Sequence, residues 1–167
     1  MRTALITVTL ALTALSAIAQ QPAGRQGARP DKTFASAADV EALLAQAKSQ
    51  RKDEPLISKN ILQLAPYSAN LEYRASVGPA AVHEKEAEIF YVIEGSATMM
   101  TGGKLVDEKR TNAANLSGTA IEGGMTRKVA KGDFIVVPEN TPHWFSAIDG
   151  TVVLMTLHVP RPVPASN

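Results

Sequence analysis

The chain has 167 residues, about the length of one domain. It contains no cysteine, which excludes thiolate catalysis, disulfides, cysteine-ligated zinc and blue-copper centres. Its 17 basic and 16 acidic residues leave a formal net charge of +1, so no basic field is present to attract nucleic acid or an anionic lipid surface.

The N-terminus has the pattern of a secretory signal peptide. Arg2 is followed by an uncharged, mostly apolar segment, residues 4–19, that ends in Ala-Ile-Ala. This pattern predicts that a signal peptide, residues 1–19, is cleaved after Ala19. The alternative is a retained membrane anchor, but sixteen helical residues span only about 24 Å of a ~30 Å hydrocarbon core. We therefore expect a periplasmic or secreted protein with no stable membrane anchor, and a mature chain with no net charge.

A linker and one helix are expected next. Residues 20–34 are rich in Gln, Gly, Pro and Arg without periodicity, as is typical of a disordered linker. Beyond it, apolar residues recur at i, i+3, i+4 and i+7 from Val40, which predicts an amphipathic helix at about residues 37–49. We expect this helix to pack on the outside of the domain and, with a charged connector, to occupy residues 35–54.

The chain is strand-like from residue 55 onward. Partly alternating apolar segments, such as residues 57–64 and 71–77, are separated by glycine and proline. The last strand is predicted at residues 151–159, and the prolines after it predict an extended tail at residues 161–167. This pattern indicates an all-β barrel or sandwich over residues 55–160, preceded by one helix.

Residues 101–127 form an unusually long segment between strands, with several glycines and many charged or polar residues. We expect a loop or an extra hairpin near the mouth of the barrel. We favour a solvent-exposed insertion over a lid that covers the mouth of the barrel.

Residues 83–95 join a polar, ligand-rich corner to an apolar strand that ends in a Glu-Gly turn signal. Glu88 stands at the root of a strand that must be half buried, which costs free energy unless a cation meets the carboxylate. A metal ion would meet it, and His83 is a second candidate ligand. The alternative is that Glu88 is the last solvated residue before the strand. In a regular strand, Phe90 and Val92 share the face of Glu88 and should line the same interior.

A second stretch contains a glycine, a short apolar strand, a proline-rich turn and a histidine. Together the two stretches resemble the two motifs of the cupin superfamily. The first motif contains His, one residue, His, three or four residues, Glu, six residues and Gly. The second contains Gly, five residues, Pro, one residue, Gly, two residues and His. The matching residues are His83, Glu88 and Gly95 in the first motif and Gly132, Pro138 and His143 in the second.

The resemblance covers roughly residues 70–160. It implies a double-stranded β-helix, the jelly-roll barrel of cupins, and a metal site at His83, Glu88 and His143. Small one-domain cupins are often homodimers, and we expect the same here. At three positions the chain departs from the pattern, and the least important is Ala147, which replaces the asparagine that usually stands four residues after the second-motif histidine. Ala81 stands where the first histidine is usual, and Asn140 replaces the turn glycine but tolerates positive φ.

Two imidazoles and one carboxylate suit Fe(II), Mn(II), Zn(II), Ni(II) or Co(II). Three protein ligands leave coordination positions for water or substrate. Glu84 and Glu86 are candidate extra ligands or acid–base groups, although a solvated charged turn is the simpler interpretation. His158, in the predicted last strand, is interpreted as a partnered side chain rather than a ligand.

The function expected from this set is that of a metal-dependent cupin enzyme acting on a small organic molecule, of dioxygenase, isomerase or lyase type. The alternative is a non-catalytic cupin module that binds a sugar or a carboxylate. A structural protein with a filled barrel is the third possibility. We expect one of Trp144 and Phe145 to face the pocket and the other to face the sheet.

Overall fold

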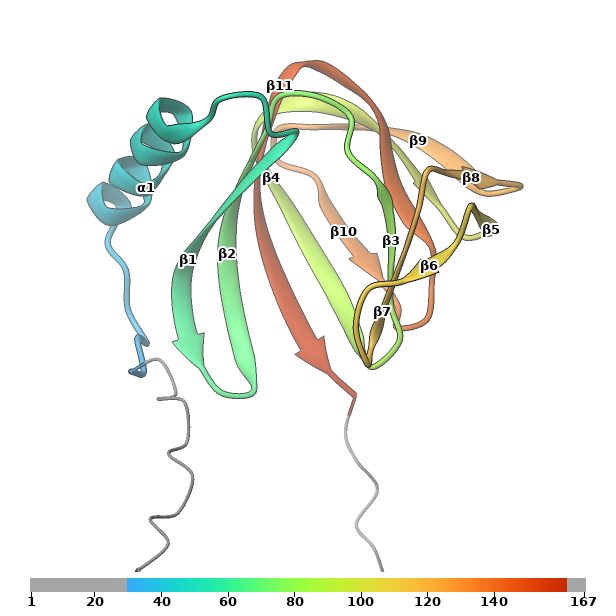
Figure 1. Ribbon diagram of the computed structural model, residues 1–167. Coiled ribbons are helices and arrows are strands. Elements are labelled where there is room, and N and C mark those ends of the chain that lie inside the picture. Colours follow the sequence, from blue (N-terminus) through green and yellow to red (C-terminus); the bar gives the residue numbers. More distant parts are fainter. Residues whose placement is uncertain (1–29, 162–167) are drawn as a thin grey trace, which may run out of the picture.

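A rolled sheet with a single helix on its outside forms the body of the molecule (Figure 1). The computed structural model describes residues 30–161. The expected signal peptide, most of the expected linker and nearly all of the expected tail lie outside the described residues. Within residues 30–161 no helix has the length and apolar character needed to cross a membrane.

The described helix and strands follow the predicted order of one helix and then strands. They are α1 (Ala37–Gln50), β1 (Leu56–Leu64), β2 (Tyr67–Arg74), β3 (Ala80–His83), β4 (Glu86–Thr101), β5 (Lys104–Val106), β6 (Lys109–Arg110), β7 (Asn115–Gly118), β8 (Ala120–Glu122), β9 (Met125–Ala130), β10 (Phe134–Val137) and β11 (His143–Pro160). The expected all-β jelly-roll class with one N-terminal helix is confirmed.

The two longest strands are β4 and β11, and they pair with each other along the barrel. β11 pairs antiparallel with β2 on one side and with β4 on the other. β1 extends the sheet beyond β2, while β9 and β10 pair with successive parts of β4. Because β4 and β11 run the full length of the barrel, each contributes residues to both ends of the interior.

The turn expected at Glu94-Gly95 is wrong, because β4 continues through it to Thr101. Gly95 has a φ of 81°, and a Cβ at this position would collide with the carbonyl oxygen of Thr151. The register of β4 against β11 also shifts here. The glycine therefore marks a bulge that lets a long strand bend around the barrel, not the end of the strand.

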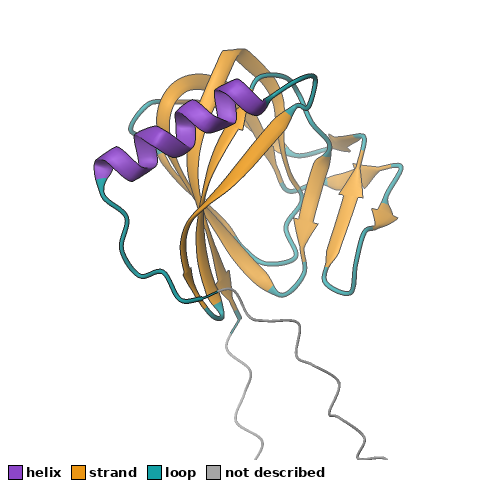
Figure 2. Ribbon diagram, turned by 60° about the vertical axis from the view of Figure 1, so that its left-hand side comes forward, coloured by secondary structure: helices purple, strands orange, loops and turns teal. Residues whose placement is uncertain are grey.

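The helix packs on the outside of the sheet, as its apolar stripe predicted (Figure 2). Its N-terminus is capped by Ser36 and Asp39, each of which bonds to the backbone N–H of the other. Its apolar side joins a cluster with Ile61, Leu71 and Val153 on the outer face of the sheet. The inner faces of the same strands are left free to line the barrel.

The interior holds a second apolar cluster. It includes Phe90, Val92, Met99, Phe145 and Leu154, all buried. Glu88 is buried on the same side of β4, which confirms the predicted shared face.

Residues 101–127 contain short strands rather than an unstructured loop. β5 pairs with β8, and β6 pairs with β7. β7 also pairs with β3, which attaches this insertion directly to the strand that carries His83. The ordered chain also begins before residue 35, since Lys32 exchanges two backbone hydrogen bonds with Gln63.

Candidate metal centre

Three strands bring three histidines and one glutamate together. His83 ends β3, Glu88 lies near the start of β4, and β11 supplies His143 at its first residue and His158 near its end. In the pairing of β4 with β11, His158 lies directly opposite Glu88. His143 lies opposite Ala81 of β3. The register of the sheet therefore concentrates histidines that are far apart in the sequence.

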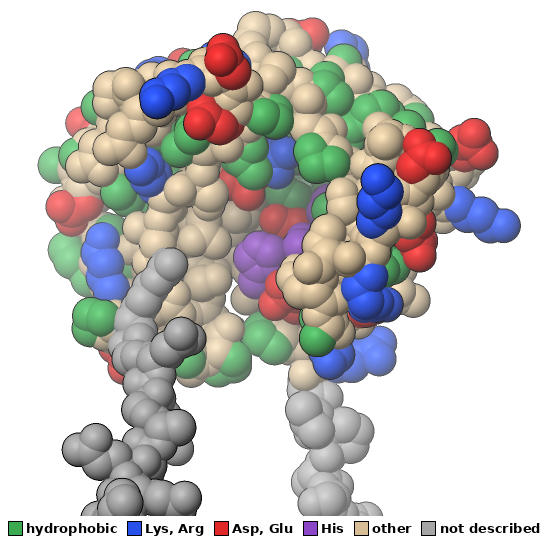
Figure 3. Space-filling model, in the orientation of Figure 1, with side chains coloured by type: hydrophobic (Ala, Val, Ile, Leu, Met, Phe, Trp, Pro, Cys, Tyr) green, Lys and Arg blue, Asp and Glu red, His purple; other side chains and the backbone are tan. Residues whose placement is uncertain are grey.

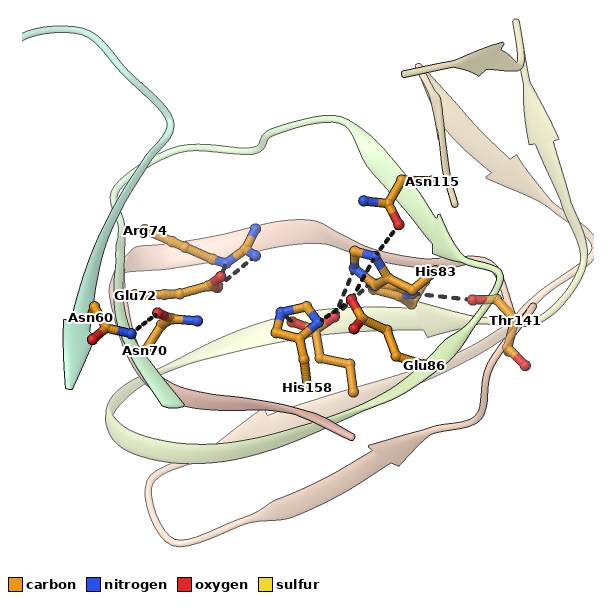
Figure 4. Close-up of polar contacts among 11 residues, drawn as sticks. Asn60, Asn70, Glu72, Arg74, His83, Glu86, Asn115, Thr141 and His158 are labelled. Atoms are coloured by element: carbon orange, nitrogen blue, oxygen red, sulfur yellow. Dashed lines mark hydrogen bonds and ion pairs between the residues drawn. The ribbon is translucent and has the colours of Figure 1, made fainter. Parts of the chain in front are cut away.

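All three imidazoles turn Nε2 toward the carboxylate of Glu88. Figure 4 shows His83 and His158 close together, with Asn115 and Glu86 beside them. Nε2 of His143 is 3.1 Å from Oε2 of Glu88, and Nε2 of His83 is 3.3 Å from the same oxygen. Nε2 of His158 lies 3.6 Å from Oε1. Ligands bound at ~2.1 Å to one cation lie roughly 3.0–3.4 Å apart. The distances from Glu88 to His143 and His83 fall in this range, and the distance from Glu88 to His158 is slightly longer.

Two overlapping groups of three can be drawn from these residues. The donor atoms of His83, Glu88 and His158 all lie within 4.8 Å of one another. His83, Glu88 and His143 form the group expected from the motifs, and both of these imidazoles contact Oε2. We treat the four side chains as one donor set, because both groups share His83 and the carboxylate.

The second nitrogen of each imidazole also has a defined partner. Nδ1 of His143 donates to the carbonyl oxygen of Thr141 at 3.1 Å, and Nδ1 of His83 donates to Oδ1 of Asn115 at 3.0 Å. Nδ1 of His158 donates to Oε1 of Glu86 at 2.8 Å. Because Nδ1 donates in each case, Nε2 is the nitrogen that faces Glu88 and that can bind a metal once it carries no proton. This arrangement is the usual support of a metal-binding histidine.

The Glu88 carboxylate remains charged although it is only 4% exposed. Burial by itself would raise the pKa of Glu88, but hydrogen bonds with His143 and His83 and the positive charge of the imidazoles outweigh burial. The pKa therefore lies well below its ordinary value. At His83, burial would lower the pKa, but hydrogen bonds with Glu88 and Asn115 dominate and raise it. The centre is thus a buried anion that attracts positive charge.

A cavity of about 240 Å³ opens onto these side chains. In the space-filling view, histidine and acidic side chains lie at the bottom of a hollow (Figure 3). Ala81, in the place of the usual first histidine, also lines this cavity and leaves space beside His143. The lining residues are Pro55, Leu56, Glu72, Arg74, Gly78, Pro79, Ala81, His83, Glu88, His143 and His158.

The two glutamates considered as extra ligands or acid–base groups have different positions. Glu84 points away from the centre and forms two hydrogen bonds with Arg110 of β6, at 2.7 and 2.9 Å. Glu86 lies beside His158 and accepts a hydrogen bond from its Nδ1. Neither residue lines the cavity. Glu84 therefore anchors the insertion, whereas Glu86 orients a histidine.

The sequence interpretation missed two residues of the centre. His158 is partnered, as expected, but its other nitrogen faces Glu88. Strand alternation was the available signal, since His158 has the parity of buried Leu154. Asn115 supports His83 from the insertion, and no local motif marks it. Trp144 and Phe145 point to different surroundings, as expected. Phe145 is buried in the interior cluster, while the Trp144 indole N–H donates to the Gly78 carbonyl oxygen at 2.8 Å.

The donor set fits a divalent cation. Imidazole nitrogens and one carboxylate oxygen suit first-row transition metals and zinc, and the carboxylate supplies the charge that a dication needs. The three imidazoles are already oriented by the acceptors that bond to their Nδ1 atoms. The match of residue types, directions and spacing supports a metal centre at this end of the barrel.

A family comparison agrees with the motifs. The family described as Cupin matches residues 51–162, about two thirds of the chain. The chain belongs to the cupin family. Asn140 of this cupin has a φ of 57°, as predicted for the turn in its second motif.

Solved structures similar to this cupin include several bacterial proteins. KdgF from a Halomonas species is 21% identical, with a TM-score of 0.49 over 68% of this chain and 87% of that one. A putative mannose-6-phosphate isomerase from Ralstonia eutropha JMP134 is 16% identical, with a TM-score of 0.47 over 66% and 91%. Hydroxypropylphosphonic acid epoxidase from S. wedmorenis is 18% identical, with a TM-score of 0.48 over 62% and 50%. A comparison with curated proteins finds no match.

Proposed function

We propose that this cupin is an enzyme that holds a divalent metal at His83, Glu88, His143 and His158 and acts on a small organic molecule beside it. One observation carries the proposal. Three imidazoles turn Nε2 toward one buried carboxylate, and each has Nδ1 held by a separate acceptor. A buried anion with three aligned nitrogen donors is what a dication requires.

The metal would act as a Lewis acid toward a bound oxygen of the substrate. The cavity beside Ala81 supports a substrate site, because a small residue replaces a ligand there and leaves room next to the donors. Pro55, Leu56 and Pro79 supply apolar walls, as expected for a small organic ligand. The donor set suits iron, manganese, zinc, nickel or cobalt, and the reaction belongs to the dioxygenase, isomerase or lyase types considered from the sequence.

The test is metal stoichiometry. Protein stripped with a chelator, reloaded with Co(II) or Mn(II) and passed through a desalting column should retain about one equivalent by elemental analysis. His143→Ala should lose the metal, and Glu88→Gln should weaken binding less completely because an amide oxygen can still ligate. Glu94→Gln is the matched control, since Glu94 is an exposed carboxylate on the same strand.

Circular dichroism should show that the variants keep the fold, which depends on the apolar strands rather than on the ion. A His143→Ala protein with a full equivalent of tightly bound metal would contradict the site. Wild type that never retains metal after reloading would favour the non-catalytic binding module instead.

We also propose that the protein is exported and forms a homodimer. The apolar N-terminal segment with its Ala-Ile-Ala end supports export, so N-terminal sequencing of exported protein should begin near Gln20. For the dimer, the support is the family resemblance and exposed apolar side chains on β10, Phe134 and Val136. Light scattering at micromolar concentration should give twice the monomer mass.

A further inference from the structure

An ion pair faces the candidate metal centre across the cavity. Glu72 and Arg74 lie two residues apart on β2, so both point to the same side of the sheet, and both line the cavity. Oε2 of Glu72 lies 2.9 Å from Nε and 2.7 Å from Nη2 of Arg74. The guanidinium carbon of Arg74 lies 4.8 Å from the centre of the Phe145 ring, over its face.

This pair has an unusual position for a structural salt bridge. The Arg74 and Glu72 side chains are 15% and 9% exposed, whereas the other lysine– or arginine–carboxylate pairs found in residues 30–161 are much more exposed. Burying such a pair costs desolvation free energy that apolar side chains would avoid. The neighbouring interior cluster is made of apolar side chains, so packing alone does not account for this pair.

The pair has hydrogen-bonding capacity left over. Oε1 of Glu72 and Nη1 of Arg74 have no hydrogen bond to any other described residue. A free acceptor therefore lies beside a free donor, and the two charges cancel. A hydroxyl group, which both donates and accepts, matches this combination. A carboxylate matches it less well, because Glu72 would repel it.

The metal end of the cavity has the opposite preference. One carboxylate and three neutral imidazoles leave positive charge on a bound dication, and Glu86 does not line the cavity. An anionic oxygen is favoured there. The cavity, about 240 Å³, is smaller than the ~300–1,000 Å³ pockets that take drug-sized ligands.

We propose that the cavity binds a short hydroxycarboxylic acid, with its carboxylate at the metal and a hydroxyl group held between Glu72 and Arg74. The proposal rests on the metal site proposed above and names the substrate class of that site. Glu72 and Arg74 are then the residues that select for the hydroxyl group.

The test compares matched ligands on Co(II)-loaded wild type. One set has four carbons, namely threonate, butanoate and erythritol, and the other has six, namely gluconate, hexanoate and sorbitol. Calorimetry should give a Kd for one hydroxy acid at least tenfold lower than for the acid without hydroxyls and for the neutral polyol. The visible spectrum of the bound cobalt should change with the hydroxy acid.

The variant Glu72→Gln/Arg74→Gln should retain cobalt and lose the preference for hydroxyls. Lys128→Gln/Asp149→Asn, at an exposed ion pair, is the matched control and should keep it. Equal binding within both ligand sets, no binding of either hydroxy acid, or a preference that survives in the Glu72/Arg74 variant would each overturn the proposal. If that variant does not fold, the wild-type comparison alone decides. Loss of the metal site itself would appear earlier, as failure to take up cobalt before any ligand is added.

Discussion

The two ends of the barrel interior are built from the same strands but have opposite contents. At the closed end, Phe90, Val92, Met99 and Leu154 pack against one another without exposure to solvent. At the open end, the interior positions carry the three histidines, Glu72, Arg74 and Glu88. On one face of β4, the change from a carboxylate at Glu88 to an aromatic ring at Phe90 takes only two residues.

The closed end of the barrel supplies stability, and the open end supplies the candidate site. Apolar burial at the closed end contributes roughly 25 cal/mol per Å² removed from water. The open end gains little of this, because its buried charges must be paired or hydrogen-bonded before they cease to be destabilising. We therefore expect substitutions at the closed end to change the free energy of unfolding and substitutions at the open end to change metal binding.

The largest effect is expected from Met99→Ala at the closed end. Met99 is fully buried, and removing its side chain should lower the free energy of unfolding by about 2–5 kcal/mol through lost burial and a cavity. Urea denaturation measures this, with Met125→Ala as the control because Met125 is 64% exposed. The cobalt affinity of folded Met99→Ala should stay close to wild type. A large loss of metal affinity in this variant would break the separation of the two ends.

The second prediction concerns the open end and the fourth donor. His158→Ala should weaken cobalt binding about 100-fold, equivalent to about 2.7 kcal/mol, because one nitrogen is lost from the set. The double variant Ala81→His/His158→Ala should recover much of the affinity, since residue 81 lines the same cavity beside His143. Competition with a chelator of known affinity measures both. Unchanged binding in His158→Ala would remove this histidine from the site.

The third prediction concerns the orientation of a donor rather than the donor itself. Asn115→Ala should weaken cobalt binding about tenfold, because Nδ1 of His83 would lose the acceptor that fixes the ring. Asn115→Asp keeps an acceptor at this position and should retain most of the affinity. If the two variants bind cobalt equally, the hydrogen bond does not support the metal site.

The motifs in the sequence were sufficient to bring His83, Glu88 and His143 together, and the alternation of strands was sufficient for the interior face of β4. His158 and Asn115 depend on register instead. The pairing of β11 with β4 shifts at three places, and such shifts decide which residue lies opposite Glu88. Asn115 faces His83 only because β7 of the insertion pairs with β3. Alternation along β11 was a local signal for the face of His158, but the residue that lies opposite across the sheet is set by tertiary packing.

The error at Glu94-Gly95 has a similar cause. Glycine marks positive φ in a turn and in a bulge alike, so the sequence alone did not distinguish the end of a strand from a bend within it. The pairing of Lys32 with Gln63 likewise lies within a segment whose composition is typical of a linker. Local composition describes the preferences of a segment, while its partner in the sheet decides whether it is ordered.

The smallest predicted effect lies at the boundary between the two ends. On β11, Thr156 stands between apolar Leu154 and His158, and its hydroxyl oxygen is fully buried without a hydrogen-bond partner. Thr156→Val keeps the shape of the side chain and removes this unsatisfied group, so it should raise the free energy of unfolding by about 1 kcal/mol. Urea denaturation measures the change, and Thr151→Val, at a half-exposed position of the same strand, is the control. The cobalt affinity should not change, because the substitution extends the closed end by one residue and leaves the donors in place. A loss of stability would show that the hydroxyl is satisfied in solution and that the polar end extends as far as Thr156.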